Sequence, residues 1–146
     1  MKALIQRVTH ASVLVNDSVT GSIDEGIVVF VGMGKGDSLE EVRELVAKIP
    51  RLRIFEDEEG KMNLSLTQVE GQILLIPEFT LYGDCSQGRR PSFGKAMDFT
   101  DAKDLFQKLL TELEANYDLT IEKGKFGSNM EVTLTNDGPV TFLLES

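Results

Sequence analysis

The sequence predicts an α+β fold in which two helices are layered on a sheet. Most apolar residues lie in short runs rich in β-branched side chains, which is typical of strands. Two longer segments instead place apolar residues three and four positions apart, as one face of an amphipathic helix does. The chain of 146 residues contains no internal repeat, linker or low-complexity tract, so we expect a single domain spanning residues 1–146.

The first segments are predicted to be strands because β-branched residues fit a pleated sheet. Residues 3–8 and 12–15 form one long strand or two, and residues 19–23 form a short partner. Residues 27–33 are continuously apolar, which indicates a strand that is buried on both faces. Three glycines alternate within residues 32–36, but no Lys-Ser or Lys-Thr pair follows them, so they favour a flexible connection over a phosphate-binding loop.

Two helices are predicted from their caps and their apolar stripes. Ser38 and Glu41 have the spacing of a capping box, and Pro50 ends or kinks the helix that this box begins. Acidic residues within 98–104 suit the first turn of a second helix because they oppose the positive end of its dipole. The stripe within residues 105–113 is then expected to face the core.

The remaining segments are predicted to be strands and polar loops. Strands are expected at residues 53–55, 73–80, 120–122, 130–134 and 140–144. The acidic residues 56–60 lack the alternate spacing of a calcium loop, which favours a solvated turn over a metal site. Residues 136–139, Asn-Asp-Gly-Pro, have the composition of a hairpin turn. Glu78, Phe79 and Thr80 bring a carboxylate, an aromatic ring and a hydroxyl to the end of a predicted strand. If these groups face the Asn-Asp-Gly-Pro turn, the two segments together form a small-molecule pocket.

The composition argues against several classes of protein. A net charge of −9 disfavours a protein that binds nucleic acid non-specifically along its length. It does not exclude a protein that binds one end of a nucleic acid through a few local cations. Cys85 is the single cysteine, which excludes an internal disulfide and favours an inert thiol over a nucleophile. One cysteine and one histidine do not make a usual zinc site, so we expect no metal and no cofactor. Without a membrane-length apolar run or a signal peptide, a cytoplasmic protein with no membrane partner is predicted.

Several motifs together resemble the D-aminoacyl-tRNA deacylases, which are also called D-tyrosyl-tRNA deacylases. The motifs are residues 3–8, 53–55, 60–64, 79–81, 90–93 and 136–141. Each motif is short, but they cover the chain in the order and spacing of the family. The resemblance implies a homodimer with a three-layer α/β/β fold, built from mixed and antiparallel sheets and two main helices. It also implies chiral proofreading, in which the ester of D-aminoacyl-tRNA is hydrolysed to free D-amino acid and tRNA.

The resemblance further assigns roles to individual residues. It implies that Gly138-Pro139 is a cis peptide inserted into the partner subunit's site, where its carbonyls bind the substrate α-amino group and exclude L-residues. Thr80 and Phe79 are the expected catalytic residues, through amides that stabilise an oxyanion and a hydroxyl that orients substrate or water. Arg7 is expected to hold the Gly-Pro loop across the dimer, and Met130 to line the pocket. Each of these residues also has a structural alternative. Phe79 and Met130 could be core residues, the Thr80 hydroxyl could bond to the backbone, and Arg7 could be a surface cation.

Five basic residues are the expected contacts to tRNA phosphates. They are Arg89, Arg90, Lys95, Lys123 and Lys125. The alternative for each one is a solvated charge on a loop, which is the usual fate of surface lysine and arginine.

The sequence departs from the family pattern at Pro77 and Glu78, where the family usually has Ser-Gln. Proline removes a backbone donor, and glutamate replaces an amide by a carboxylate. We expect Glu78 to bind the substrate ammonium or to act as a base toward water, unless its side chain points outward. The departure also leaves two alternative functions open: a deacylase with a shifted substrate, such as glycyl- or small L-aminoacyl-tRNA, and a non-catalytic dimeric module that binds the aminoacyl end of tRNA.

Overall fold

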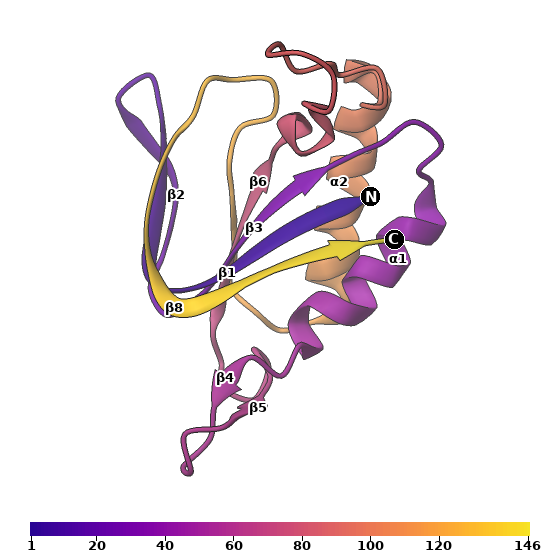
Figure 1. Cartoon of the computed structure of the whole chain (residues 1–146). Helices are drawn as coiled ribbons and strands as arrows, with labels where there is room; N and C mark the ends of the chain where they lie inside the picture. The colour runs from indigo at the N-terminus through magenta and orange to yellow at the C-terminus, as the bar shows by residue number, and fades with distance from the viewer.

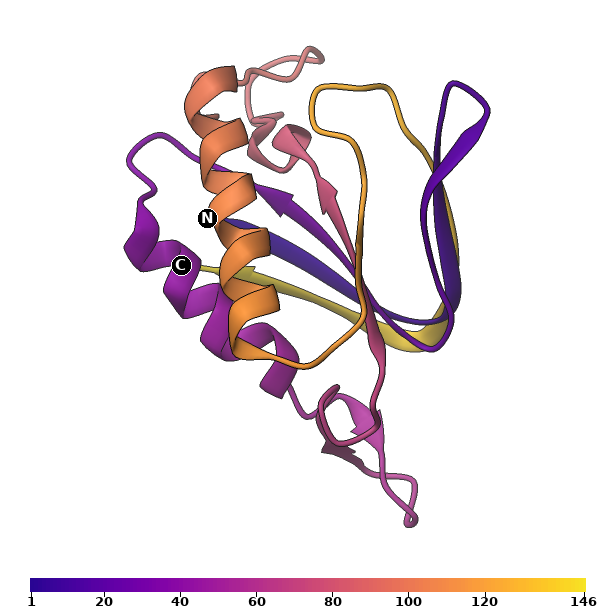
Figure 2. The same ribbon diagram turned by 180° about the vertical axis from the view of Figure 1, so that it is seen from behind.

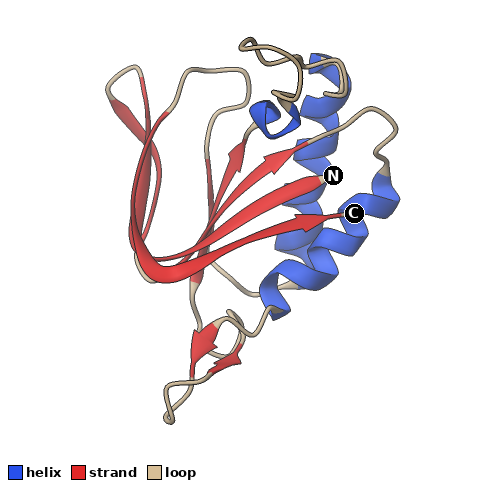
Figure 3. Ribbon diagram, in the orientation of Figure 1, coloured by secondary structure: helices blue, strands red, loops and turns tan.

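The computed structural model describes residues 1–146 as two helices packed against a strongly bent sheet (Figures 1 and 3). The strands are β1 (Lys2–Val15), β2 (Ser18–Ile23), β3 (Gly26–Gly32), β4 (Phe55–Glu56), β5 (Met62–Leu64), β6 (Gln72–Pro77), β7 (Ile121–Lys123) and β8 (Glu131–Glu145). The helices are α1 (Leu39–Lys48) and α2 (Phe99–Asn116), and short 3-10 turns lie at η1 (Ile49–Arg51) and η2 (Phe79–Tyr82).

Strand β1 organises the sheet because it pairs along nearly its whole length. Its first half is antiparallel to β3 and its second half is antiparallel to β2. On its other edge, β8 runs antiparallel along both halves. Strand β6 is parallel to β3, and β7 is parallel to β6, so the sheet is mixed as expected. Strands β4 and β5 form a separate two-stranded hairpin that projects from the body of the molecule (Figure 1).

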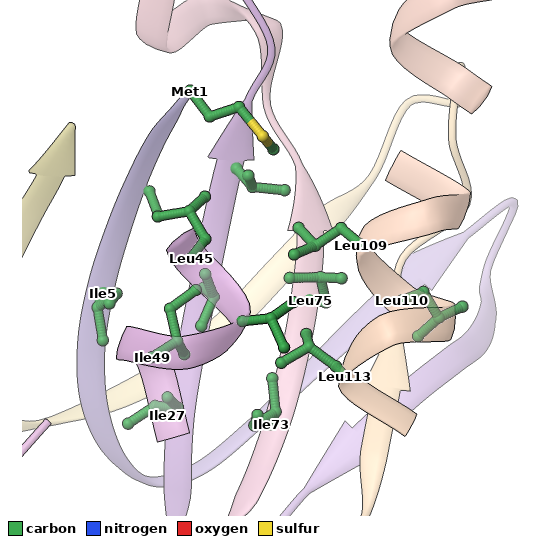
Figure 4. Packing of buried hydrophobic residues seen from close by; sticks show 14 of the residues in the cluster. Met1, Ile5, Ile27, Leu45, Ile49, Ile73, Leu75, Leu109, Leu110 and Leu113 are labelled. Atoms are coloured by element: carbon green, nitrogen blue, oxygen red, sulfur yellow. The ribbon is translucent and has the colours of Figure 1, made fainter. Parts of the chain in front are cut away.

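The bend of β1 and β8 folds the sheet over on itself and produces three layers (Figure 2). On one face of β3 and β6, Ile27 and Leu75 belong to the core that α1 and α2 cover (Figure 4). On the other face, the neighbouring residues Val28 and Leu74 pack with Ile23 of β2 in a second core. Successive side chains of a strand point to opposite faces, so these continuously apolar strands supply both cores. The expected three-layer α/β/β fold is confirmed.

Both helices begin as their sequences predict. The Ser38 hydroxyl accepts a bond from the Glu40 backbone N–H at 3.2 Å, and the Glu41 carboxylate accepts one from the Ser38 N–H at 2.6 Å, which completes the capping box. Pro50 lies in η1, directly after α1 ends. The buried side chains of α2 are Ala102, Leu105, Phe106, Leu109, Leu110 and Leu113. Neither α1 nor α2 combines the length and the apolar character that a membrane-spanning helix needs.

Three predicted elements are changed in the structure. The Asn-Asp-Gly-Pro segment is not a hairpin turn, because β8 continues through it and the segment forms a bulge opposite β1. The strand expected to reach residue 80 ends at Pro77 and is followed by η2. The strand expected at residues 53–55 is Phe55–Glu56, and its partner β5 was not predicted because it is short and partly polar. Of the two alternatives left open for residues 3–8 and 12–15, the structure shows one continuous strand.

Candidate functional site

A cavity of about 580 Å³ opens at the end of β6, where the chain turns into η2. Ten of its 15 lining residues are hydrophobic, and its volume lies in the usual range of small-molecule sites. Three distant parts of the chain build it: the ends of β3 and β6 with η2, the beginning of α2 with the residues before it, and the loop from β7 into β8, which rises beside β6 in Figure 2. The lining residues include Val31, Met33, Ile76, Pro77, Glu78, Phe79, Met97, Phe99, Phe126 and Met130.

The sharp end of β6 positions η2 at the mouth of this cavity. The Glu78 N–H still donates to the Val31 carbonyl at 2.8 Å, which extends the parallel ladder by one residue. The chain then turns, and the Gly83 N–H donates to the Thr80 carbonyl at 2.9 Å. Phe79 and Thr80 are the first residues of η2, and the first amides of any helical turn have no acceptor within it. These two N–H groups are therefore donors that the turn leaves without a backbone acceptor.

Gly32 at the end of β3 makes room for η2. A Cβ at this position would lie 2.9 Å from the Glu78 carbonyl oxygen and 3.2 Å from Leu81 Cβ. The turn therefore packs directly on the bare backbone of β3. This close approach, rather than phosphate binding, accounts for the first of the three alternating glycines.

Glu78 and Thr80 form a side-chain pair at the cavity mouth. The Thr80 hydroxyl donates to the Glu78 carboxylate. The alternative prediction, in which this hydroxyl bonds to the backbone, is therefore wrong. A hydroxyl that donates its proton to a carboxylate keeps its lone pairs for another donor. Phe79 is 60% exposed and contacts Phe93 with ring centroids 5.0 Å apart, so it is not a core residue. Glu78 and Phe79 thus lie at the rim of the cavity and Met130 lies in its wall, while Thr80 is tied to the rim through its bond to Glu78.

Arg7 and the Gly-Pro segment lie apart from this cavity in the single chain. Arg7 is only 4% exposed, and its Nε donates to the Asp137 carbonyl at 3.1 Å and pairs with Asp137 Oδ2 at 3.0 Å. A second guanidinium nitrogen donates to the Ile54 carbonyl at 2.7 Å. Arg7 is therefore a buried residue that holds the bulge within its own chain, and not a surface cation. The Gly138-Pro139 peptide is cis, as the resemblance implies.

The five candidate phosphate contacts are all exposed, and none of them lines the cavity. Arg89, Arg90 and Lys95 lie on the loop that follows η2. Lys123 ends β7, and Lys125 precedes Phe126 in the opposite wall. On the first loop, hydrogen bonds from Ser86, together with the nearby Lys95 charge, lower the pKa of the Asp84 carboxyl below its usual range.

Two aromatic residues of the site were missed by the sequence reasoning. Phe99 is 62% exposed at the start of α2 and contacts Phe126, with ring centroids 5.3 Å apart. Phe99 extends the apolar stripe of α2 by one turn, and its ring lies against Phe126 and Gly127 in the cavity wall. The sequence did contain a signal for Phe99, because it is an apolar residue that precedes the buried positions of the α2 stripe.

Comparison with known proteins shows the family of this chain. Residues 4–145 match the family model described as D-Tyr-tRNA(Tyr) deacylase. The chain belongs to this deacylase family. Among its relatives, proteins named D-aminoacyl-tRNA deacylase from Thermosipho africanus and Fervidobacterium nodosum are 48% and 49% identical over 146 residues, which is 100% of this chain and 97% of each relative. The resemblance found in the sequence motifs is confirmed.

Two solved structures share the deacylase fold. One, titled c-Myc DNA Unwinding Element Binding Protein, superposes with a TM-score of 0.95 at 40% identity and covers 100% of this chain and 99% of its own. Another, titled as the structural analysis of a probable eukaryotic D-amino acid tRNA deacylase, has a TM-score of 0.81 and covers 98% and 97% of the two chains. At 17% identity, the second likeness shows the fold alone.

Proposed function

We propose that this chain hydrolyses the ester between a D-amino acid and the 3′ end of tRNA, releasing free D-amino acid and tRNA in the cytoplasm. The family membership and the relatives named for this activity support the reaction. The single structural observation that carries the proposal is the mostly apolar cavity with the η2 amides and the Glu78–Thr80 pair at its mouth. Such a site receives an uncharged aminoacyl side chain while polar groups meet the ester.

The chain's own groups supply binding and electrostatic stabilisation. Water attacks the ester carbonyl carbon, and the negative charge that develops on the carbonyl oxygen is stabilised by the N–H groups of Phe79 and Thr80. The intermediate then collapses and expels the ribose oxygen, which takes up the proton that the attacking water has given up. The Thr80 oxygen, whose proton is directed to Glu78, accepts a hydrogen bond from the substrate or from the attacking water.

An assay with three charged tRNAs tests the proposal against its alternatives. D-Tyr-tRNA, Gly-tRNA and L-Ala-tRNA are incubated with the protein, and the release of each amino acid is followed over time. We expect rapid release of D-Tyr only. Preferred release of glycine or L-Ala instead supports the shifted substrate that the Pro77-Glu78 departure keeps open. Binding of all three without hydrolysis supports a non-catalytic module.

We further propose a homodimer in which the Gly138-Pro139 segment of one subunit enters the cavity of the other. Within one chain, neither residue lines the cavity. Strand β8 pairs with β1 on one edge only, and it exposes Phe142 and Leu143 by 40% and 51%. An unpaired edge with exposed apolar side chains is a suitable surface for a second copy.

The dimer is expected in solution at micromolar concentration. Multi-angle light scattering is predicted to give twice the chain mass of 16.2 kDa, because the subunit alone has an incomplete site. A monodisperse species of one chain mass at this concentration contradicts the shared-site arrangement.

Replacing Glu78 by glutamine is expected to raise KM and to change kcat by less than about tenfold. The carboxylate at the cavity mouth is proposed to pair with the substrate ammonium, which an amide holds less strongly. Glutamine is also the residue that the family usually has here. Steady-state kinetics on D-Tyr-tRNA separates the roles, because loss of a general base lowers kcat by about 10²–10⁴-fold. A thousandfold loss of kcat therefore shows that Glu78 is a base.

Binding of tRNA is expected to be local and modest because the net charge is −9. The double variant Arg89→Ala/Arg90→Ala should weaken binding equally for all aminoacyl groups and reduce the slope of log K against log[salt] by about one to two. The control is Arg43→Ala/Lys48→Ala, which removes two exposed cations from α1. A change in enantiomer preference in Arg90→Ala contradicts a phosphate role and places the loop in the pocket.

A further inference from the structure

The bulge in β8 changes how a carbonyl of β1 is bonded. Val8 pairs with Asn136 and Gln6 with Thr141, so residues 137–140 of β8 all face Arg7. An insertion of this kind interrupts the backbone ladder and leaves polar groups of the facing residue to find other partners. The Arg7 carbonyl accepts a hydrogen bond from the side-chain Nδ2 of Asn136 at 3.1 Å. A side chain thus provides the donor that an unbroken strand would supply.

The same carboxamide spans the bulge from its first residue to its last. Asn136 Nδ2 also donates to the Val140 carbonyl at 3.0 Å, so both protons of the amide are used. Asn136 Oδ1 lies where a side chain on Gly138 would be, since a Cβ there would be 2.5 Å from it. The amide therefore fixes the end of the bulge and lies against its middle.

The hydrogen bonds from the Arg7 and Asn136 side chains hold the residues before and after the Gly-Pro pair, but not the pair itself. Arg7 Nε donates to the carbonyl of Asp137, and Asn136 donates to the carbonyl of Val140. The carbonyls of Gly138 and Pro139 lie between these two fixed points and are not acceptors for either side chain. Their directions are consequently set by the groups that hold the residues before and after them.

We propose that Asn136 is a positioning residue for enantiomer selection. It fixes the directions of the Gly138 and Pro139 carbonyls, and it touches no substrate itself. This inference rests on the proposed function and on the role that the family resemblance implies for those carbonyls, which is to bind the substrate α-amino group together with Glu78. Backbone dipoles select one enantiomer only if they are held in place, because displacements near 1 Å at a reacting centre already cost about 10²-fold in rate.

The substitution Asn136→Ala tests this role. The ratio of kcat/KM for D-Tyr-tRNA over L-Tyr-tRNA is expected to fall about tenfold or more, since two hydrogen bonds to the bulge are lost. Gln6→Ala is the matched control, because Gln6 Nε2 also bonds across β1 and β8, to Thr141 Oγ1 at 3.0 Å, without holding the backbone of the bulge. The control should keep the wild-type ratio. An unchanged ratio in Asn136→Ala overturns the inference.

A double-mutant cycle with Gly138→Ala gives a second test. Alone, the added Cβ meets Asn136 Oδ1 and should lower the enantiomer ratio. In the Asn136→Ala background this obstacle is gone, so Gly138→Ala should lower the ratio little further. Additive effects of the two substitutions show that the residues act independently and contradict the inference.

Hydrogen exchange by NMR tests the clamp without any assay of activity. Asn136 and Asn129 are both exposed, but only the Asn136 side-chain amide donates to two backbone carbonyls, so its protons should exchange more slowly than those of Asn129. Equal exchange rates overturn the clamp. A wild-type protein that hydrolyses no D-aminoacyl-tRNA instead refutes the proposed function, while the exchange rates still decide whether Asn136 holds the bulge.

Discussion

Alanine at position 32 is expected to lower kcat on D-aminoacyl-tRNA by about 100-fold. The new Cβ would lie 2.9 Å from the Glu78 carbonyl oxygen and 3.2 Å from Leu81 Cβ, and both atoms are fixed to the backbone around η2. Strand β3 is held between β1 and β6, so η2 has to move instead. Displacement of catalytic amides by about 1 Å costs on the order of 10² in rate.

The control for this variant is Gly94→Ala in the nearby loop. A Cβ at Gly94 has the Ser92 hydroxyl oxygen as its nearest neighbour, at 3.8 Å, so kcat should stay at the wild-type value. Steady-state kinetics on D-Tyr-tRNA, together with the urea midpoint of each variant, separates a displaced turn from an unfolded chain. A folded Gly32→Ala enzyme with wild-type kcat contradicts the role assigned to the η2 amides.

Alanine at position 26 is expected to have the largest effect on stability. A Cβ there would lie 2.0 Å from the backbone oxygen and 2.6 Å from the backbone nitrogen of Gln72, the residue with which Gly26 pairs in β6. Gly26 also pairs with Val8 on its other side, so neither neighbouring strand has room to move. Overpacking of this severity should lower the free energy of unfolding by at least about 3 kcal/mol.

Urea denaturation followed by circular dichroism measures this loss, with Gly94→Ala again as the control. The midpoint of Gly26→Ala should fall well below that of the wild type, or the variant should fail to accumulate as folded protein. A change in unfolding free energy below about 1 kcal/mol would mean that β3 and β6 separate more easily than their pairing indicates.

The layers of the fold were predictable because periodicity reports burial directly. Residues 27–33 are apolar at every position, and the structure buries them between two cores. Ser38 and Glu41 predicted a helix start that depends only on neighbouring residues. Arg7 also carried a usable signal, since it follows Ala3 and Ile5 at the inward positions of an alternating strand. A cation at an inward position requires internal partners, and the structure supplies Asp137 and the Ile54 carbonyl.

The features that were mispredicted depend on distant parts of the chain. Residues 136–139 have the composition of a turn, but whether such a segment reverses the chain or bulges depends on the strand beside it. Because β1 continues past the segment, β8 continues as well. The wall of the cavity formed by Phe99 and Phe126 likewise exists only when α2 meets the loop before β8. Neither the pairing of β8 with β1 nor the contact of α2 with the loop before β8 can be predicted from the local sequence.

The pairing of β1 with β8 has a consequence for the synthesis of the protein. Lys2 pairs with Glu145, and Leu14 with Glu131, so the partner of the strand made first is the strand made last. Such distant pairing slows folding, because the entropy of closing a long loop is lost before the contacts form. Until β8 leaves the ribosome, one edge of β1 has no partner, and an open strand edge is prone to associate with other chains. Nascent chains that stall before residue 131 are therefore expected to be the aggregation-prone form of this protein.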